Sequence, residues 1–162
     1  MTVRVQREVF DVTQLIASLQ ANDPGVGAVV NFVGFVRDIN QGEAVAGLFL
    51  EHYPGMTERS LQKIIDNARA RWALRAVQIV HRIGRLSVSE PIVFVGVSSP
   101  HRQAAFEACA FIMDYLKTDA PFWKREDVAG GARWVDARDS DRSAVERWAD
   151  TPQVAAMQRV PA

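Results

Sequence analysis

The feature that most constrains the fold is a set of short apolar runs rich in β-branched residues. The clearest, VGAVVNFVGFV over residues 26–36, predicts a strongly apolar strand in which Gly34 marks a bulge or a close backbone approach. Further strands are predicted for residues 3–9, AVAGLFLEHY at 44–53, RAVQIVHRIG at 75–84 and PIVFVGVS at 91–98. We expect the strand at 44–53 to pair antiparallel with the strand at 26–36, across the polar loop RDINQGE.

Helical patterns alternate with these strands. Asp11 begins a capping-box pattern for a helix at 12–21, and Thr57 is expected to cap a helix of about 16 residues. Later segments predict a long helix in SSPHRQAAFEACAFIMDYLK, a hairpin around Gly130-Gly131 and a short helix in SDRSAVERW. The sequence therefore predicts an α+β fold with a mixed, largely antiparallel sheet, one domain over residues 1–148 and a loose tail over 149–162.

Composition narrows the classes of function. The chain has 162 residues, with 19 lysines and arginines against 19 aspartates and glutamates, so any anion site must be local and general nucleic-acid binding is not expected. The one cysteine, Cys109, excludes an intrachain disulfide, and the three histidines, His52, His81 and His101, lack metal-ligand spacing. A metal site is therefore not expected. Because no long apolar run occurs, we expect a soluble, cytoplasmic protein without a membrane span.

The stretch DYLKTDAPFWKRE places two lysines beside apolar and aromatic residues. Lys117 is expected at the end of the long helix, and Pro121 stops that helix before Lys124. If the following segment folds back, the two ammonium groups converge, depress each other's pKa and attract an anion, so that one of them can act as a nucleophile or general base. Alternatively, Lys117 only caps the helix and extends to solvent.

The start of the same helix, SSPHR, is a second candidate anion site. Ser99 is a suitable N-cap and Pro100 a suitable first residue, which places His101 and Arg102 in the first turn. A bound anion would favour cations there, although Arg102 could instead turn to solvent or to an acidic neighbour. His101 and Lys117 are roughly 24 Å apart on an unbroken helix, so they could share a pocket only across a two-fold dimer.

The expected core face of this helix carries Phe106, Cys109, Met113 and Leu116, so Cys109 is interpreted as packing rather than as a nucleophile. Other prominent residues also have structural interpretations. His81 and Arg82 are expected to be structural, Glu51 and His52 to fix a turn, and Trp72, Trp134 and Trp148 to lie in the core or an interface.

Six motifs in order resemble one family: GAVVNFVGFVRD, LEHYPGMTE, VHRIGRL, VFVGVSSPHR, FIMDYLKTDAPFWKRE and RWVDAR. Over roughly residues 26–140 the chain resembles the catalytic (large) subunit of molybdopterin synthase. The resemblance implies an α/β-hammerhead-type fold with an added β subdomain. It also implies transfer of sulfur to cyclic pyranopterin monophosphate, the substrate, with no resident cofactor. The sulfur would come from the C-terminal Gly-Gly thiocarboxylate of a small ubiquitin-like subunit, in a heterotetramer built on a homodimer of large subunits.

The resemblance also assigns residues. Lys117 and Lys124 match the two essential lysines of the family. The substrate-binding residues that it implies are Phe35, Val36, Arg37, His101, Arg102, Arg125, Glu126 and Arg138. Family members often carry lysine where this chain has Phe35, which leaves a side-chain contact at that position open.

Two hypotheses of other classes remain open at this point. The chain could be a non-catalytic module that binds a phosphorylated heterocycle through the SSPHR segment, or a scaffold that docks a ubiquitin-like protein. Replacing Lys117 by alanine separates the enzyme from the module, because only the enzyme would lose product formation. Binding of the pyranopterin without the small protein separates the module from the scaffold.

Overall fold

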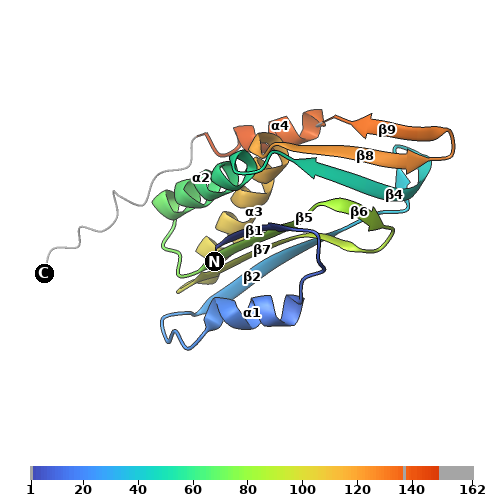
Figure 1. The fold of residues 1–162 in the computed structure, drawn as a ribbon. Helices are drawn as coiled ribbons and strands as arrows, with labels where there is room; N and C mark the ends of the chain where they lie inside the picture. Colours follow the sequence, from blue (N-terminus) through green and yellow to red (C-terminus); the bar gives the residue numbers. More distant parts are fainter. Residues whose placement is uncertain (1, 137, 150–162) are drawn as a thin grey trace, which may run out of the picture.

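The computed structural model describes residues 2–136 and 138–149, which form four helices and two sheets (Figure 1). The elements are β1 (Val3–Gln6), α1 (Val12–Gln20), β2 (Ala28–Phe35), β3 (Ile39–Asn40), β4 (Glu43–His52), α2 (Met56–Arg71), β5 (Val77–Arg82), β6 (Gly84–Ser87), β7 (Pro91–Ser99), α3 (Arg102–Asp119), β8 (Phe122–Val128), β9 (Gly131–Val135) and α4 (Asp139–Glu146). No helix in these two ranges is long and apolar enough to span a membrane. Apart from Ala149, the predicted tail lies outside the described residues.

The first sheet has the strand order β1-β5-β7-β2, in which only β1 and β5 are parallel. Helix α1 covers one face of this sheet, and α2 and α3 cover the other (Figure 1). Side chains alternate between these faces along β7, where Val95 contacts the α2–α3 side and Phe94 contacts α1. The register shifts at Gly34, next to Phe35, so the predicted bulge is confirmed.

The second sheet has the order β3-β4-β8-β9, with β6 also paired to β4. The prediction that residues 44–53 pair with residues 26–36 is therefore wrong. The intervening segment is not an open loop but a tight β3–β4 hairpin, because Gln41 and Gly42 adopt φ angles of 53° and 81°. This hairpin starts a separate sheet, and the predicted hairpin at Gly130-Gly131 is confirmed as the β8–β9 connection.

Together the two sheets confirm the predicted α+β class, with largely antiparallel pairing and an added β subdomain formed by the second sheet.

Two predicted helix caps are wrong. Gly55, not Thr57, is the N-cap of α2, and the Thr57 hydroxyl instead donates to the Pro121 carbonyl at 3.0 Å, which ties the start of α2 to the start of β8. His101 is the N-cap of α3, because β7 continues through Ser99, which pairs with Ala28. The first helical residue of α3 is therefore Arg102.

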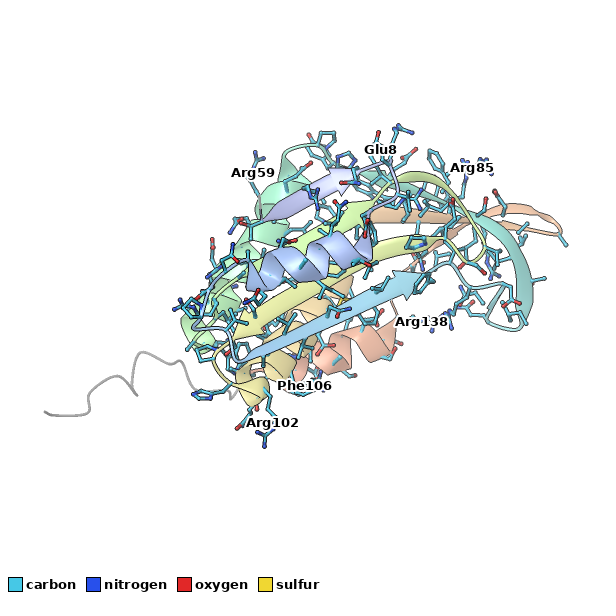
Figure 2. The ribbon with its side chains drawn as sticks, turned by 90° about the horizontal axis from the view of Figure 1, so that it is seen from below. Glu8, Arg59, Arg85, Arg102, Phe106 and Arg138 are labelled. Atoms are coloured by element: carbon cyan, nitrogen blue, oxygen red, sulfur yellow. The ribbon has the colours of Figure 1, made fainter. Side chains whose placement is uncertain are left out.

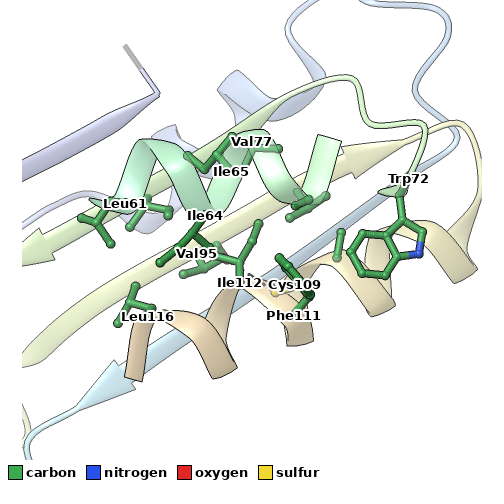
Figure 3. Close-up of a cluster of buried hydrophobic side chains, with 14 of the residues drawn as sticks. Leu61, Ile64, Ile65, Trp72, Val77, Val95, Cys109, Phe111, Ile112 and Leu116 are labelled. Atoms are coloured by element: carbon green, nitrogen blue, oxygen red, sulfur yellow. Dashed lines mark hydrogen bonds between the residues drawn. The ribbon is translucent and has the colours of Figure 1, made fainter. Parts of the chain in front are cut away.

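The main core lies between α2, α3 and the first sheet (Figure 3). Cys109 packs in it, and burial raises the pKa of the Cys109 thiol to about 11, which confirms its interpretation as a packing residue. Leu116 is also buried, but Phe106 is 61% exposed, so its predicted place in the core is wrong. Trp72 and Trp148 are buried in the core, whereas Trp134 is exposed.

Candidate active site

A cavity of about 590 Å³ opens between the two sheets, close to the end of α3. Its wall is formed by β2 and β7 of the first sheet, the last turn of α3, β8 of the second sheet, and the start of α4. The apolar part of the wall consists of Phe32, Val33, Phe35, Leu50, Ile92, Val93, Leu116, Ala120, Phe122 and Val135. A cavity of this size with a few polar groups on an apolar wall is typical of a small-molecule site.

Both lysines of the DYLKTDAPFWKRE stretch line this cavity. Lys117 lies in the last turn of α3, and the chain then reverses through Ala120 and Pro121 into β8, which carries Lys124. Burial lowers the pKa of Lys124, and the neighbouring positive charge of Lys117 lowers it further. The structure thus brings the two lysines into one cavity, and their catalytic role stays a prediction.

Two arginines add to the positive charge of the cavity. Arg37 follows β2, and Arg138 immediately precedes α4. Both lower the pKa of Lys124, while Glu126 raises it. The carboxylates of Asp136 and Asp141 also line the cavity. Within residues 2–136 and 138–149, none of the four cations forms a carboxylate ion pair, so all four charges remain available to an anion.

Phe35, Val36 and Glu126 lie at one edge of the site. Phe35 and Arg37 line both the main cavity and a smaller adjoining pocket of about 40 Å³, whose wall also contains Val36 and Glu126. Phe35 is 55% exposed, whereas Val36 and Glu126 are buried. The structure thus places these three predicted residues beside Lys124, which lines both spaces.

Arg125 is not brought into the cavity. Successive side chains of a strand point to opposite faces, so Arg125 points away from the side occupied by Lys124 and Glu126. Its guanidinium lies 4.9 Å from the ring centroid of Phe49 and 5.8 Å from that of Trp134. The prediction that Arg125 lines the site did not take this alternation into account.

His101 and Arg102 also lie outside the cavity. They are at the opposite end of α3, which is unbroken from Arg102 to Asp119. Figure 2 shows Arg102 and Phe106 projecting together from the start of this helix, away from Arg138. His101, Arg102 and Gln103 are all exposed at this helix start, so one chain alone does not unite the two predicted anion sites.

Comparison with known proteins identifies the family. The sequence model described as MoaE protein matches residues 5–119, which is more than half of the chain. The chain belongs to the MoaE family. The molybdopterin synthase catalytic subunit of Pseudomonas aeruginosa is 60% identical over 148 residues, covering 91% of this chain and 99% of that protein.

Solved structures of MoaE-family proteins agree with this fold. The molybdopterin biosynthesis MoaE protein of Burkholderia ambifaria has a TM-score of 0.78 at 50% identity, covering 91% of this chain and 97% of that one. The molybdopterin synthase of Staphylococcus aureus has a TM-score of 0.77 at 33% identity, covering 82% of this chain and 96% of that one.

In this MoaE-family chain the cavity wall also contains His81, which sequence analysis treated as structural only. The His81 ring stacks on Phe122 with centroids 3.8 Å apart, and Nδ1 lies 2.8 Å from the Arg82 carbonyl oxygen. Burial lowers the pKa of His81 to about 4, with a further contribution from the two lysines. His81 lies on the same strand face as the core residues Val77 and Ile79. A histidine at such an apolar position was the sequence signal from which its place in the cavity wall could have been predicted.

Asn40 was also missed, because residues 37–43 were interpreted as a polar loop. It lies on β3, is 5% exposed, and joins the smaller pocket beside Glu126. Among the described residues, no group of three histidine, cysteine, aspartate or glutamate side chains is placed to hold a metal ion.

Proposed function

We propose that this chain is the catalytic subunit of a molybdopterin synthase, a sulfurtransferase of molybdenum cofactor biosynthesis. It transfers sulfur from the C-terminal thiocarboxylate of a small ubiquitin-like subunit to cyclic pyranopterin monophosphate, and so builds the dithiolene of molybdopterin. The observation that carries this proposal is the convergence of Lys117, Lys124, Arg37 and Arg138 in one cavity, in a chain of the MoaE family.

The charges of the cavity suit this reaction. The thiocarboxylate and the cyclic phosphate are both anionic, and four cations in one cavity lower the repulsion between them. Attack by the thiocarboxylate sulfur passes through an anionic intermediate, which a nearby ammonium group stabilises. Lys124, whose pKa is lowered by burial, can also exchange a proton with the reacting groups.

The two lysines take different positions in this proposal. The charges of Arg37, Arg138 and Glu126 all act on the Lys124 ammonium group and shift its pKa. This supports a position of Lys124 beside the anionic substrate. Lys117 lies at the helix end next to Leu116 and Ala120, and we assign it to the incoming thiocarboxylate tail. The apolar wall then holds the extended Gly-Gly tail and excludes water from the reacting sulfur.

The assembly we propose is a cytoplasmic heterotetramer, in which a homodimer of large subunits carries one small subunit at each end. The support for the homodimer is the separation of two cationic ends on one unbroken α3. A two-fold axis can bring His101 and Arg102 of one protomer to the cavity of the other, where they would add to substrate binding. No resident cofactor is proposed, since the pterin is the substrate.

Reconstitution tests this function. The purified chain is mixed with a thiocarboxylated small subunit and cyclic pyranopterin monophosphate, and molybdopterin is quantified. We expect turnover by the wild type and a loss of about 100-fold or more in Lys117→Ala and in Lys124→Ala, on the scale known for removing one stabilising donor. Lys63→Ala is the matched control, because Lys63 is exposed on α2 and lies outside the cavity.

The outcomes separate the proposed enzyme from a binding module. Unchanged turnover in Lys117→Ala and Lys124→Ala, with the complex intact by gel filtration, contradicts the proposed chemistry. Loss of turnover in both variants, with Lys63→Ala active, supports it.

A further inference from the structure

Asn40 is a buried side chain whose two polar atoms both have charged partners. Its Nδ2 group donates to Glu126 Oε1 at 2.7 Å, and its Oδ1 atom accepts from Nη2 of Arg138. These partners lie 86 and 98 residues away in the chain, on β8 and just before α4. Asn40 therefore connects the second sheet to the segment that carries a cavity arginine.

The orientation of the Asn40 amide is fixed by its neighbours. Glu126 is 4% exposed, and its other oxygen accepts from Nε and Nη2 of Arg133 at 3.3 and 3.2 Å. A carboxylate can only accept, so the NH2 group of Asn40 must face Glu126 and its carbonyl oxygen must face Arg138. Arg133 also donates to the Asn40 backbone carbonyl at 3.2 Å, which holds this residue in place.

Arg138 needs such an anchor. It immediately precedes α4 and is exposed, and its long side chain loses rotamer freedom when it is held in one position. Within the described ranges, Asn40 is the one side chain that accepts a hydrogen bond from its guanidinium. The other hydrogen bond of Arg138 with a side chain uses its backbone N–H, which donates to Asp141.

A neutral amide also suits the charge of the site. A carboxylate at position 40 would orient Arg138 but would pair with its charge and compete with an anionic substrate. The amide orients the guanidinium and leaves its positive charge in the cavity. The charge of Glu126, in contrast, is paired with Arg133.

We propose that Asn40 is a positioning residue that holds Arg138 toward the anionic group of the substrate while leaving its charge free. The substrate in this statement rests on the proposed function. The orientation of Arg138 by Asn40 rests only on the hydrogen bonds described above.

A double-mutant cycle tests the proposal. Asn40→Ala, Arg138→Ala and the double variant are assayed in the reconstituted synthase for kcat and for KM of the pyranopterin. We expect a rise in KM of about tenfold in each single variant, since each loses a charge-assisted hydrogen bond, with a smaller change in kcat. If Asn40 acts through Arg138, the double variant is no worse than Arg138→Ala. If the KM increases of the two single variants multiply in the double variant, the proposal is overturned.

Two further measurements keep the proposal testable if Asn40→Ala does not fold. The exchange Asn40→Asp with Glu126→Gln restores a hydrogen bond between these positions with reversed direction, but it places a carboxylate against Arg138. We expect a melting temperature near that of the wild type and a KM about tenfold above that of Glu126→Gln alone. A KM equal to that of Glu126→Gln would overturn the role of the neutral amide.

Binding of inorganic phosphate, measured by calorimetry on the purified chain, gives the same comparison without turnover. We expect phosphate binding about tenfold weaker in the Asn40→Asp, Glu126→Gln exchange than in Glu126→Gln. Equal binding would contradict the proposal. A wild type that binds phosphate but makes no molybdopterin would instead contradict the proposed function and leave the Asn40 comparison intact.

Discussion

The two ends of α3 both carry exposed cations, but only the C-terminal end borders a cavity. At its C-terminal end, Lys117 lies on the wall of a cavity with Leu116 and Phe122. At its N-terminal end, His101 and Arg102 are exposed, and Phe106 beside them is 61% exposed (Figure 2). A cation becomes part of a binding site through the wall around it, and one chain provides such a wall at only one of these ends.

Helix electrostatics sharpens this contrast. A cation in the last turn faces the negative end of the helix dipole, so Lys117 stabilises α3. A cation at the first residue faces the positive end, so Arg102 is mildly unfavourable there. Arg102 has no ion-pair partner among the described residues, so its position is not explained by the stability of the helix. An anion bound across a dimer interface would explain it.

Complementation between two inactive chains gives the largest expected effect. Arg102→Ala and Lys117→Ala homodimers are each expected to be inactive. Random exchange makes half of the dimers mixed, and each mixed dimer has one intact site, so we expect about a quarter of the wild-type turnover. The measurement is molybdopterin formation after co-refolding of the two variants.

No recovery in that mixture, with mixed dimers detected by mass spectrometry, would contradict a shared site. The control mixture combines Lys117→Ala with Lys124→Ala. Both of these lysines line one cavity, so no intact site can form in a mixed dimer. Recovery of turnover in this control mixture would show that activity is restored by something other than a site shared between two protomers.

The contrast between the helix ends also separates what sequence could predict from what it could not. The convergence of Lys117 and Lys124 in one cavity was one of two alternatives that the sequence left open, and it could be considered because Pro121 ends the helix between them. The place of Phe106 was wrong because helical spacing defines a stripe but not where the sheet beneath it ends. The cap at Ser99 was wrong because strand pairing with Ala28 outweighed a local capping preference.

Long-range pairing accounts for the other errors. Residues 44–53 were a clear strand, but strand propensity does not choose the partner, and the tight turn at Gln41-Gly42 sent the chain into a second sheet. Asn40 could not be found for the same reason, since its partners Glu126 and Arg138 are 86 and 98 residues away.

The cavity at the C-terminal end of α3 should also make the stability of the fold depend on pH. His81 lines the cavity, and burial lowers its pKa from the usual value of about 6.5 to about 4 in the folded chain, with smaller contributions from the charges of Lys117, Lys124 and His52. The unfolded chain therefore takes up the proton first. Stability should fall as pH decreases from about 6.5 to about 4, by up to about 3 kcal/mol.

Urea unfolding of the wild type and of His81→Gln between pH 7 and pH 4.5 measures this contribution. Glutamine does not titrate, so the difference between the two proteins should shrink steadily on acidification. If the stability difference between the two proteins stays constant over this range, His81 is more accessible to water than the structure indicates. That result would weaken the contrast between the cavity end of α3 and its N-terminal end.

The smallest expected effect concerns Arg125, which lies next to Lys124 in sequence but faces away from it. Because its guanidinium packs on Phe49 and Trp134, Arg125→Ala should lower the free energy of unfolding by about 1 kcal/mol. Turnover should stay within about threefold of the wild type, since the Arg125 side chain lies outside the cavity wall and faces away from it. Lys124→Ala should show the reverse pattern, with turnover lost and stability nearly kept, because it removes a cation that other cations already destabilise. A turnover loss of more than about tenfold in Arg125→Ala, at an unchanged melting temperature, would place the outer face of β8 in the site.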